Sequence, residues 1–347
     1  MQMRDCGKSG LKISALGVGC WSFGGGQYWG AQAQEDVDQV VRRAVELGIT
    51  YFDTAEAYNE GRSEESLGKA IRGISRDRIV IGTKISPSNT APAVLAEHCE
   101  ASLRRLGTEY IDLYMVHWPI PSGANGHLGE EANSSRSAER AFETIRKLQQ
   151  QGKVRHIGVS NFAAPRLREA METGTEIAVD QLPYSLVARA IEHEVLPLCR
   201  EIGLGVIGYM PLWQGLLTDR YDSLEELPAM RRRTRQFDAR KNELARHGEH
   251  GAEEETWQAV VAVRKIAREL SLSTSDLALR WALGGPGMSC VLAGARNREQ
   301  LEANVAATAE RLTGEAVQKL ADATEALKVK LGPSCDYFES TDNDRTR

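Results

Sequence analysis

Several short apolar runs in this chain each end on a polar residue that could contact a cofactor or a reacting oxygen. These terminal residues are Asp53, Lys84, His117, Ser160 with Asn161, Gln181 and Tyr209. Near-continuous apolar runs are typical of parallel strands that are buried on both faces, and in a closed eight-stranded barrel the C-terminal strand ends meet at one mouth. We therefore expect these residues, although distant in sequence, to share one site.

Three of these residues, together with the nearby Tyr58, suggest acid-base chemistry. Residues 53–58 directly follow a predicted strand, so Asp53 and Tyr58 can both face the mouth. A phenol, with an ordinary pKa of about 10, is a proton donor at neutral pH, and a nearby ammonium such as that of Lys84 would lower its pKa toward a useful range. Asp53 could hold the ammonium by a charge-assisted hydrogen bond, and His117 is a second donor.

Two donors that converge on one oxygen suit a carbonyl group that becomes an alkoxide during hydride addition. In the reverse direction the ionised phenol would deprotonate an alcohol. No metal is required in this scheme. His247 and His250 lie in a charged, loop-like region without a ligand motif, and we predict that they are surface residues.

Strand-like and helical patterns alternate along the chain. Helices are predicted at residues 37–45, from Ser63 onward, at 91–106 and 137–151, from Pro165 onward, at 191–201 and within 253–283, with Ser63 as the N-cap of the second. Eight strands are predicted near residues 13–17, 49–53, 78–84, 110–117, 154–160, 178–181, 205–209 and 290–292.

Short connections between alternating strands and helices imply right-handed crossovers and a parallel sheet, and eight units are the number that closes a (β/α)8 TIM barrel. An open doubly wound sheet is the alternative. No linker-like break is visible, so we expect one domain over residues 1–347, with a barrel core at about residues 13–310 and a C-terminal extension at 328–347. Gly17 and Gly19 lack the third glycine of a dinucleotide-binding fingerprint, and we interpret them as a tight turn.

Charge and composition exclude several functions. A net charge of -5 and a pI near 5.9 argue against a nucleic-acid-binding protein. The basic run at residues 231–235 is interpreted as solvated, with contact to a cofactor phosphate as the alternative. Six scattered cysteines predict reduced, mostly buried thiols, and the lack of a signal peptide or membrane span predicts a cytoplasmic protein without a membrane partner.

Three stretches exceed what a barrel needs: residues 118–136, 210–252 and the tail from 328. Long loops at a barrel mouth commonly select the substrate. Trp21, Trp29, Trp118 and Trp213 follow predicted strands, where exposed rings could line a substrate pocket. For residues 336–347 we expect either a disordered end or a segment that folds over the mouth of its own or a neighbouring subunit.

The chain resembles an aldo-keto reductase from its first strand to about residue 307. In that superfamily, residues matching Asp53, Tyr58, Lys84 and His117 form a catalytic tetrad, with Tyr58 as the general acid and base. The motif of residues 158–162 resembles the family signature in which Ser160 and Asn161, together with Gln181, hold the nicotinamide carboxamide. Tyr209 matches the ring that stacks on the nicotinamide.

Residues 294–304 resemble the family's adenosine-phosphate segment. By that resemblance, Arg296 and Gln300 contact the phosphate end of the adenosine moiety, Asn304 contacts the adenine, and Gly294 and Ala295 also belong to the cofactor-binding site. The resemblance favours NADP(H) over NAD(H). Ala293 and Ala303 depart from the family pattern, which weakens the cofactor preference but not the cofactor class.

These observations predict an NAD(P)(H)-dependent oxidoreductase that interconverts a small-molecule carbonyl and an alcohol. A sugar or polyol dehydrogenase using the same residues in the oxidative direction is one alternative. Polar residues 125–137 would suit a hydroxyl-rich substrate. A regulatory binding protein, like the channel subunits that resemble this family, is another. The sequence leaves a homo-oligomer open and does not fix the substrate.

Overall fold

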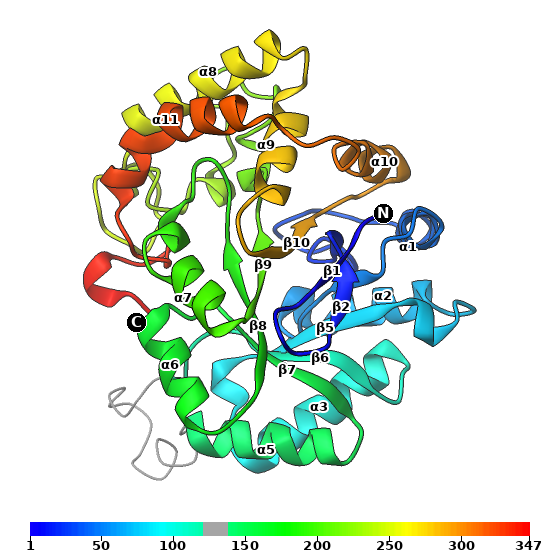
Figure 1. Cartoon of the computed structure of the whole chain (residues 1–347). Coiled ribbons are helices and arrows are strands. Elements are labelled where there is room, and N and C mark those ends of the chain that lie inside the picture. Colours follow the sequence, from blue (N-terminus) through cyan, green and yellow to red (C-terminus); the bar gives the residue numbers. More distant parts are fainter. Residues whose placement is uncertain (121–137) are drawn as a thin grey trace.

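The computed structural model describes residues 1–120 and 138–347, in which eight parallel strands form a closed barrel (Figure 1). The strands are β3 (Leu16–Gly19), β4 (Tyr51–Asp53), β5 (Val80–Ile85), β6 (Ile111–Val116), β7 (Val154–Ser160), β8 (Ile177–Pro183), β9 (Gly205–Tyr209) and β10 (Met288–Ala293). Neighbours in sequence are neighbours in the barrel, and β10 closes it by pairing with β3. The (β/α)8 prediction is confirmed, and the open doubly wound alternative is wrong.

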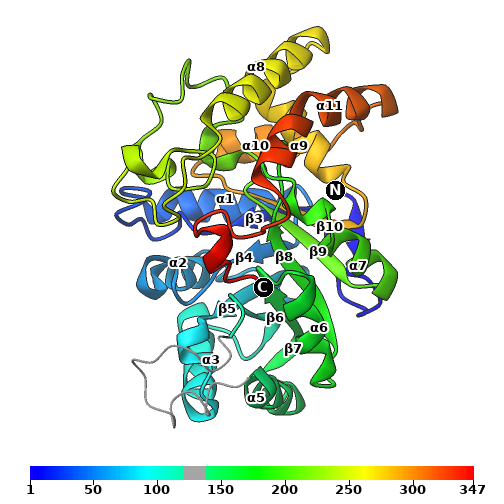
Figure 2. The same ribbon diagram turned by 90° about the vertical axis from the view of Figure 1, so that its left-hand side faces the viewer.

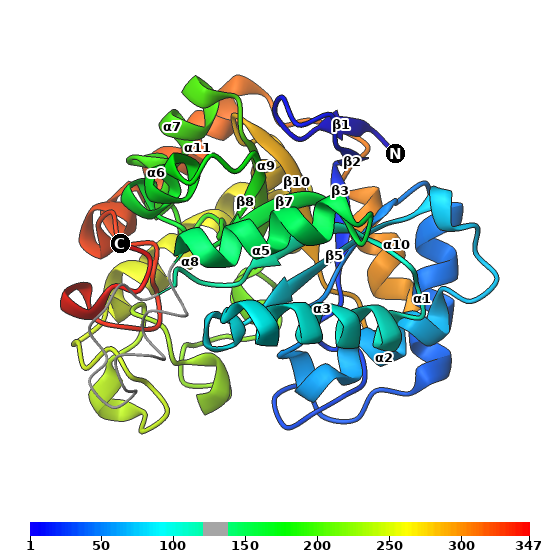
Figure 3. The ribbon, with the colours of Figure 1, turned by 90° about the horizontal axis from the view of Figure 1, so that it is seen from below.

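Helices surround this barrel. They are α1 (Gln34–Glu46), α2 (Arg62–Ala70), α3 (Pro92–Leu106), α5 (Ala138–Gln150), α6 (Ala164–Glu172), α7 (Val195–Ile202), α8 (Glu253–Glu269), α9 (Thr274–Leu283), α10 (Arg298–Ala306) and α11 (Gly314–Leu331). Figure 3 shows α3 and α5 side by side on the outside of the strands. Two helices outside the simple alternation, α8 and α11, pack against each other at one side of the barrel (Figure 1).

The helical faces follow the apolar spacing of the sequence. In α1 the buried side chains Val37, Val40, Val41 and Ala44 recur every three or four residues, so one stripe faces the barrel.

The predicted N-cap at Ser63 is wrong. Gly61, with a φ of 86°, precedes the first turn of α2, and the Ser63 hydroxyl instead donates to the Cys20 carbonyl oxygen at 2.7 Å. Ser63 therefore does not cap α2 but connects this helix to the residue that directly follows β3.

An antiparallel hairpin covers the N-terminal end of the barrel. It consists of β1 (Met3–Asp5) and β2 (Lys12–Ser14), with Arg4 paired to Ile13. The predicted first strand at residues 13–17 therefore combined the end of β2 with the start of β3. Cys6, Leu11 and Ile13 pack with the apolar side chains inside the barrel, so the hairpin closes the end opposite the mouth.

Glycines in the strands make room for one interior side chain. A Cβ at Gly17 would lie 2.8 Å from the Tyr51 ring, and a Cβ at Gly82 would lie 2.3 Å from the Tyr51 hydroxyl. Gly17 and Gly19 belong to β3, so their interpretation as a tight turn is wrong. The missing side chains allow Tyr51 to stand inside the barrel beneath the site.

The C-terminal segment after α11 is ordered and crosses the mouth. In Figure 2 this red segment lies over one end of the barrel. Its contacts are with residues that follow β6, β7, β8 and β9, so the expectation of a disordered end is wrong. Within the described residues, no helix combines the length and apolar composition needed to cross a membrane.

Candidate active site

Asp53, Lys84 and Tyr58 form one hydrogen-bonded group at the C-terminal ends of β4 and β5. The Lys84 ammonium donates to Asp53 Oδ2 at 2.7 Å, to the Thr54 carbonyl oxygen at 2.8 Å and to the Tyr58 hydroxyl at 3.2 Å. The Lys84 side chain is fully buried and Asp53 is only 3% exposed. A buried ammonium requires such partners, because an unpaired charge in this position would be costly.

The second carboxylate oxygen of Asp53 also has hydrogen-bond donors around it. Asp53 Oδ1 accepts hydrogen bonds from Gln181 Nε2 at 2.7 Å and from the Tyr51 hydroxyl at 3.2 Å. Gln181 stands at the end of β8 and Tyr51 at the start of β4. The sequence placed Gln181 near a nicotinamide, but its contact with Asp53, and the supporting role of Tyr51, depend on barrel closure.

His117 completes the group from the end of β6. Its ring lies 5.5 Å from the Tyr58 ring, centroid to centroid, with the planes 74° apart. Burial lowers the pKa of the His117 imidazole well below its ordinary value, and the Lys84 ammonium lowers that pKa further. The imidazole is therefore neutral at physiological pH and offers a single N–H donor.

Burial raises the pKa of the Tyr58 hydroxyl well above its ordinary value, and the Asp53 carboxylate adds to the rise. The expectation that the lysine leaves this tyrosine with a lowered pKa is therefore wrong, because burial and the Asp53 carboxylate both raise that pKa. Burial also lowers the pKa of Lys84, an effect that Asp53 opposes. At neutral pH the phenol is protonated and can act as a proton donor.

The backbone around Tyr58 is strained. Asn59, Glu60 and Gly61 have φ values of 51°, 61° and 86°, so three consecutive residues are left-handed. The Asn59 side-chain amide stabilises this turn by donating to the carbonyl oxygens of Trp21 at 2.8 Å and Phe23 at 2.9 Å. Asn59 was not among the predicted site residues, although asparagine tolerates this conformation better than most residues.

Ser160, Asn161 and Tyr209 form a second group beside His117. Asn161 has a φ of 65°, and its amide donates to the His117 carbonyl oxygen at 2.9 Å and to Ser160 Oγ at 3.1 Å. The Tyr209 hydroxyl donates to Asn161 Oδ1 at 2.7 Å, while Ser160 Oγ donates to the Gln181 carbonyl oxygen at 2.9 Å. Hydroxyl and amide groups of this kind fit the carboxamide of a nicotinamide, which needs both donors and acceptors.

The predicted phosphate segment, residues 294–304, directly follows β10 and includes most of α10. Arg296 donates from Nε to Gln32 Oε1 at 2.9 Å, from Nη1 to the Trp29 carbonyl oxygen at 2.9 Å and from Nη2 to the Ala31 carbonyl oxygen. Its backbone N–H donates to Gln300 Oε1 at 2.9 Å. Within residues 1–120 and 138–347, no carboxylate forms an ion pair with Arg296. A cation balanced only by carbonyl dipoles, next to the N-terminus of a helix, fits an anionic phosphate.

Asn304 and Ala295 of the same segment are buried within the protein, whereas the backbone at Gly294 is open. Asn304 is mostly buried and donates from Nδ2 to the Gly294 carbonyl oxygen at 3.1 Å. Ala295 is buried. A Cβ at Gly294 would meet nothing closer than 3.8 Å, so the backbone there is open to close approach.

The four predicted pocket tryptophans have different environments. The Trp21 ring lies 5.8 Å from the Tyr58 ring and 5.3 Å from the Trp29 ring, so these two indoles extend one aromatic wall away from the catalytic group. Trp118 directly follows His117 and is partly exposed. Trp213, expected as an exposed ring, is only 2% exposed because it packs against Tyr337 of the tail.

Two predictions about surface residues are also corrected. The basic run is not simply solvated: the Arg231 and Arg233 guanidinium groups lie 5.7 Å and 5.2 Å from the rings of Trp29 and Tyr28, and Arg235 pairs with Glu249 at 2.8 Å. His247 is 3% exposed rather than a surface residue, whereas His250 is exposed. Long loops that fold back on the barrel bury residues that local sequence marks as polar.

Neither a metal centre nor a disulfide is formed by the described residues. No group of three potential metal ligands is found within residues 1–120 and 138–347. All six cysteines lie in this part of the chain and are free, and the prediction that most of them are buried is confirmed. The polar residues 125–137 that were considered for a hydroxyl-rich substrate lie outside the described residues.

Comparison with known proteins agrees with this site. Residues 15–325 match the model of the Aldo/keto reductase family. The NADH-specific methylglyoxal reductase of Escherichia coli is 30% identical over 347 residues, covering 94% of this chain and all of that protein. Aldo-keto reductase YhdN of Bacillus subtilis is 33% identical over 319 residues, covering 87% of each chain.

Solved structures of other proteins are also similar to this chain over most of its length. The glycerol dehydrogenase AKR11B4 from Gluconobacter oxydans has a TM-score of 0.74 and 26% identity, covering 93% of this chain and 95% of that chain. An aldo-keto reductase from Klebsiella pneumoniae in complex with NADPH has a TM-score of 0.66 and 26% identity, with 96% of each chain covered. The barrel, the arrangement at its mouth and these similarities lead to one conclusion: the chain belongs to the aldo/keto reductase family and is an NAD(P)H-dependent oxidoreductase.

Proposed function

We propose that this protein reduces small aldehydes or ketones to alcohols, with Tyr58 as the proton donor. The observation that carries this proposal is the position of the buried Lys84 ammonium, 3.2 Å from the Tyr58 hydroxyl and 2.7 Å from Asp53. A donor that must hand its proton to a developing alkoxide benefits from a nearby positive charge as it becomes a phenolate.

A nicotinamide held by Ser160, Asn161 and Tyr209 would supply the hydride for reduction of the carbonyl. In the proposed reaction the substrate oxygen accepts hydrogen bonds from Tyr58 and from the neutral His117. As the oxygen becomes negative, the Tyr58 proton moves to it, and the Lys84 ammonium stabilises the phenolate that remains. Asp53 holds Lys84 in place throughout.

The protonation state of Tyr58 at neutral pH suits the proton transfer that reduction requires. The raised pKa of its hydroxyl keeps the donor protonated at neutral pH, as reduction requires, whereas oxidation of an alcohol requires the phenolate. The similarity to a methylglyoxal reductase supports a small aldehyde as substrate.

A second candidate is oxidation of a polyol. The similarity in structure to the glycerol dehydrogenase of Gluconobacter oxydans favours it. The raised pKa of Tyr58 predicts that such activity increases at alkaline pH, where more of the phenol is ionised. The membership of the chain in a family of oxidoreductases favours these enzymatic candidates over a regulatory subunit.

For the cofactor, the proposal is a preference for NADP(H). The support is Arg296, whose guanidinium has no acidic partner among the described residues and whose backbone N–H donates to Gln300 at the start of α10. Ser160, Asn161 and Tyr209 are proposed to hold the nicotinamide end. An aldo-keto reductase structure at 26% identity contains NADPH, while the 30% identical methylglyoxal reductase is NADH-specific, so the preference requires a direct test.

The experiment combines a turnover screen with one variant. Purified protein is assayed with NADPH and with NADH against methylglyoxal, simple aldehydes, ketones, aldoses and glycerol. Tyr58→Phe is expected to lower kcat by about 10²- to 10⁴-fold, since only the proton donor is lost. Cofactor affinity, measured by quenching of tryptophan fluorescence, should remain unchanged. Near-normal turnover by Tyr58→Phe would refute the assigned role.

A further inference from the structure

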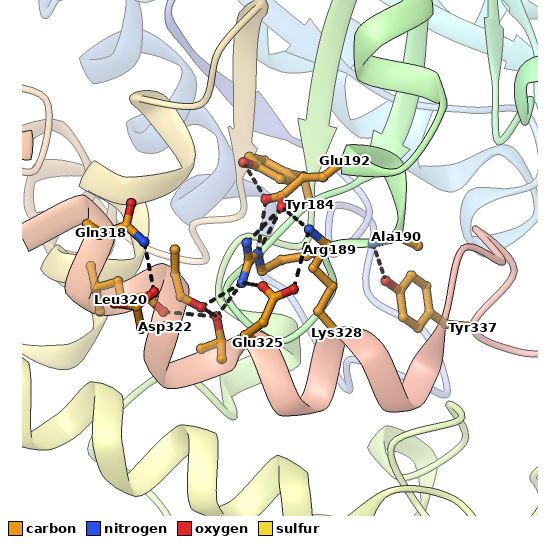
Figure 4. Close-up of polar contacts among 12 residues, drawn as sticks. Tyr184, Arg189, Ala190, Glu192, Gln318, Leu320, Asp322, Glu325, Lys328 and Tyr337 are labelled. Atoms are coloured by element: carbon orange, nitrogen blue, oxygen red, sulfur yellow. Dashed lines mark hydrogen bonds and ion pairs between the residues drawn. The ribbon is translucent and has the colours of Figure 1, made fainter.

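The C-terminal strap, which we define as residues 332–347, begins at a point that is fixed relative to the barrel. The strap continues from α11, and α11 is held to the segment after β8 by a buried polar cluster (Figure 4). Arg189 Nη1 donates to the Ala321 carbonyl oxygen at 2.9 Å and to Thr324 Oγ1 at 3.0 Å, and Lys328 pairs with Glu192 at 3.1 Å. The end of α11 is therefore fixed relative to the barrel.

The middle of the strap is tied to two loops at the mouth. The Tyr337 hydroxyl accepts a hydrogen bond from the Ala190 N–H at 3.1 Å (Figure 4), and its carbonyl oxygen accepts one from the Arg235 N–H at 2.8 Å. The Tyr337 ring packs edge to face on Trp213 at 5.0 Å. Glu339 pairs with Arg246 at 2.8 Å. These contacts bind the strap to segments that follow β8 and β9.

The tip of the strap reaches the catalytic side of the mouth. The Thr346 carbonyl oxygen accepts a hydrogen bond from the Ala163 N–H at 2.8 Å, two residues beyond Asn161. Arg345 donates from Nε and Nη2 to the two oxygens of Asp336 at 2.6 Å and 2.9 Å, and Asp336 is fully buried. A bidentate pair of this kind fixes the plane and position of the guanidinium.

Arg345 covers one face of a mouth residue. Its guanidinium carbon lies 3.9 Å from the centre of the Trp118 ring, and Trp118 directly follows His117. The charges of the strap also act on Tyr209. Burial raises the pKa of the Tyr209 hydroxyl, Tyr58 and Asp336 add to the rise, and Arg345 opposes it. The Arg345 charge is balanced by Asp336 and lies 4.0 Å from Glu339, so it is not available as a binding site for an anionic substrate.

We infer that Arg345 is a positioning residue that holds the Trp118 indole as a fixed wall of the substrate site, and that this wall selects carbonyl substrates by size. The inference rests on the proposed carbonyl reduction. The Arg345 guanidinium on one face of the indole limits movement of the ring toward the strap, because a cation over an indole face is attracted to it. The ring then narrows the mouth on the side of β6.

The test compares two aldehydes, propanal and naphthaldehyde, with the full-length protein and saturating cofactor. The readout is the ratio of their kcat/KM values, which does not depend on the fraction of folded enzyme. Arg345→Ala is expected to change this ratio by about 10-fold or more in favour of the bulky aldehyde, through KM. Cofactor affinity should remain within about twofold, since no hydrogen bond or ion pair among the described residues joins the strap to residues 294–304.

Two variants and a control make the test specific. Arg347→Ala removes a positive charge from the same strap, but Arg347 pairs with Asp344 at 3.5 Å and should leave the ratio unchanged. Arg345→Ala leaves Asp336 unpaired and could unfold the strap. The double variant Asp336→Asn, Arg345→Gln keeps a neutral pair and should give the same change in the ratio.

Trp118→Leu tests whether Arg345 changes the ratio of kcat/KM values through Trp118. If Arg345 acts through Trp118, Trp118→Leu alone shifts the ratio in the same direction, and adding Arg345→Ala changes it no further. A ratio within about twofold of wild type in both Arg345 variants would overturn the inference, as would full additivity with Trp118→Leu. Lack of turnover by the wild-type protein on every carbonyl would instead contradict the proposed function.

Discussion

Replacement of Lys84 by Met tests the electrostatic basis of the proposed mechanism. The variant keeps a side chain of similar length but removes the buried ammonium 3.2 Å from the Tyr58 hydroxyl. At an effective dielectric constant of about 20, two unit charges at that distance attract by about 5 kcal/mol. With 1.36 kcal/mol for each factor of ten in rate, this attraction sets a ceiling of roughly 10⁴-fold. We expect a loss of kcat between about 10²- and 10⁴-fold.

The same replacement has a separate cost in stability. It leaves Asp53, which is 3% exposed, without its positively charged partner, and breaking such a buried pair costs about 3–5 kcal/mol. The double variant Asp53→Asn, Lys84→Met removes both charges and keeps donors from Gln181 and Tyr51 nearby. Its melting temperature should therefore recover most of the loss, while its turnover should remain as low as in the single variant.

The assay measures melting temperature, cofactor affinity and kcat as a function of pH in both reaction directions. Without the ammonium, the Tyr58 phenol ionises less readily, so the alkaline rise of the oxidative reaction should move to higher pH. Turnover near the wild-type value in a folded double variant would refute the reasoning. An unchanged pH profile in the oxidative direction would also contradict it, because the ammonium would then have no effect on the phenolate.

Two further predictions concern the cofactor and the stability of the barrel. Arg296→Leu should weaken NADPH binding by about 10- to 100-fold but leave NADH binding within about twofold, as measured by fluorescence quenching, and equal losses for both cofactors would disprove a phosphate contact. Asp180 is fully buried, neither carboxyl oxygen has a hydrogen-bond partner among the described residues, and burial raises its pKa well above the ordinary value. A group with a raised folded-state pKa stabilises the fold at low pH, and this stabilisation is lost as the pH rises toward that pKa. The melting temperature of Asp180→Asn relative to wild type should therefore increase from about pH 5 to pH 8, and a constant difference would contradict the proposed ionisation.

Strand ends were the most predictable part of the site. Asp53, Lys84 and His117 each terminate a run of apolar residues, and parallel strands in a closed barrel bring such ends together. The partners of these residues were less predictable. The hydrogen bonds from Gln181 and Tyr51 to Asp53 depend on the register of β4 and β8 across the barrel, which local periodicity does not contain.

The segments outside the barrel were predicted least well. Trp213 and His247 were expected at the surface, but the first packs against the strap and the second is buried within the long segment after β9. Residues 336–347 have a polar composition, yet their contacts with Trp118 and Ala163 order them over the mouth. Apolar content alone did not indicate this, because the strap is held largely by ion pairs and backbone hydrogen bonds.

The sequence by itself determined the alternation of strands and helices and the types of residue at the strand ends, because periodic burial within one element is encoded locally. Tertiary structure decided the protonation state of Tyr58 and the partners of Arg345. Both depend on burial and on charges contributed by segments that are distant in the chain, and those quantities exist only once the barrel and its loops have packed.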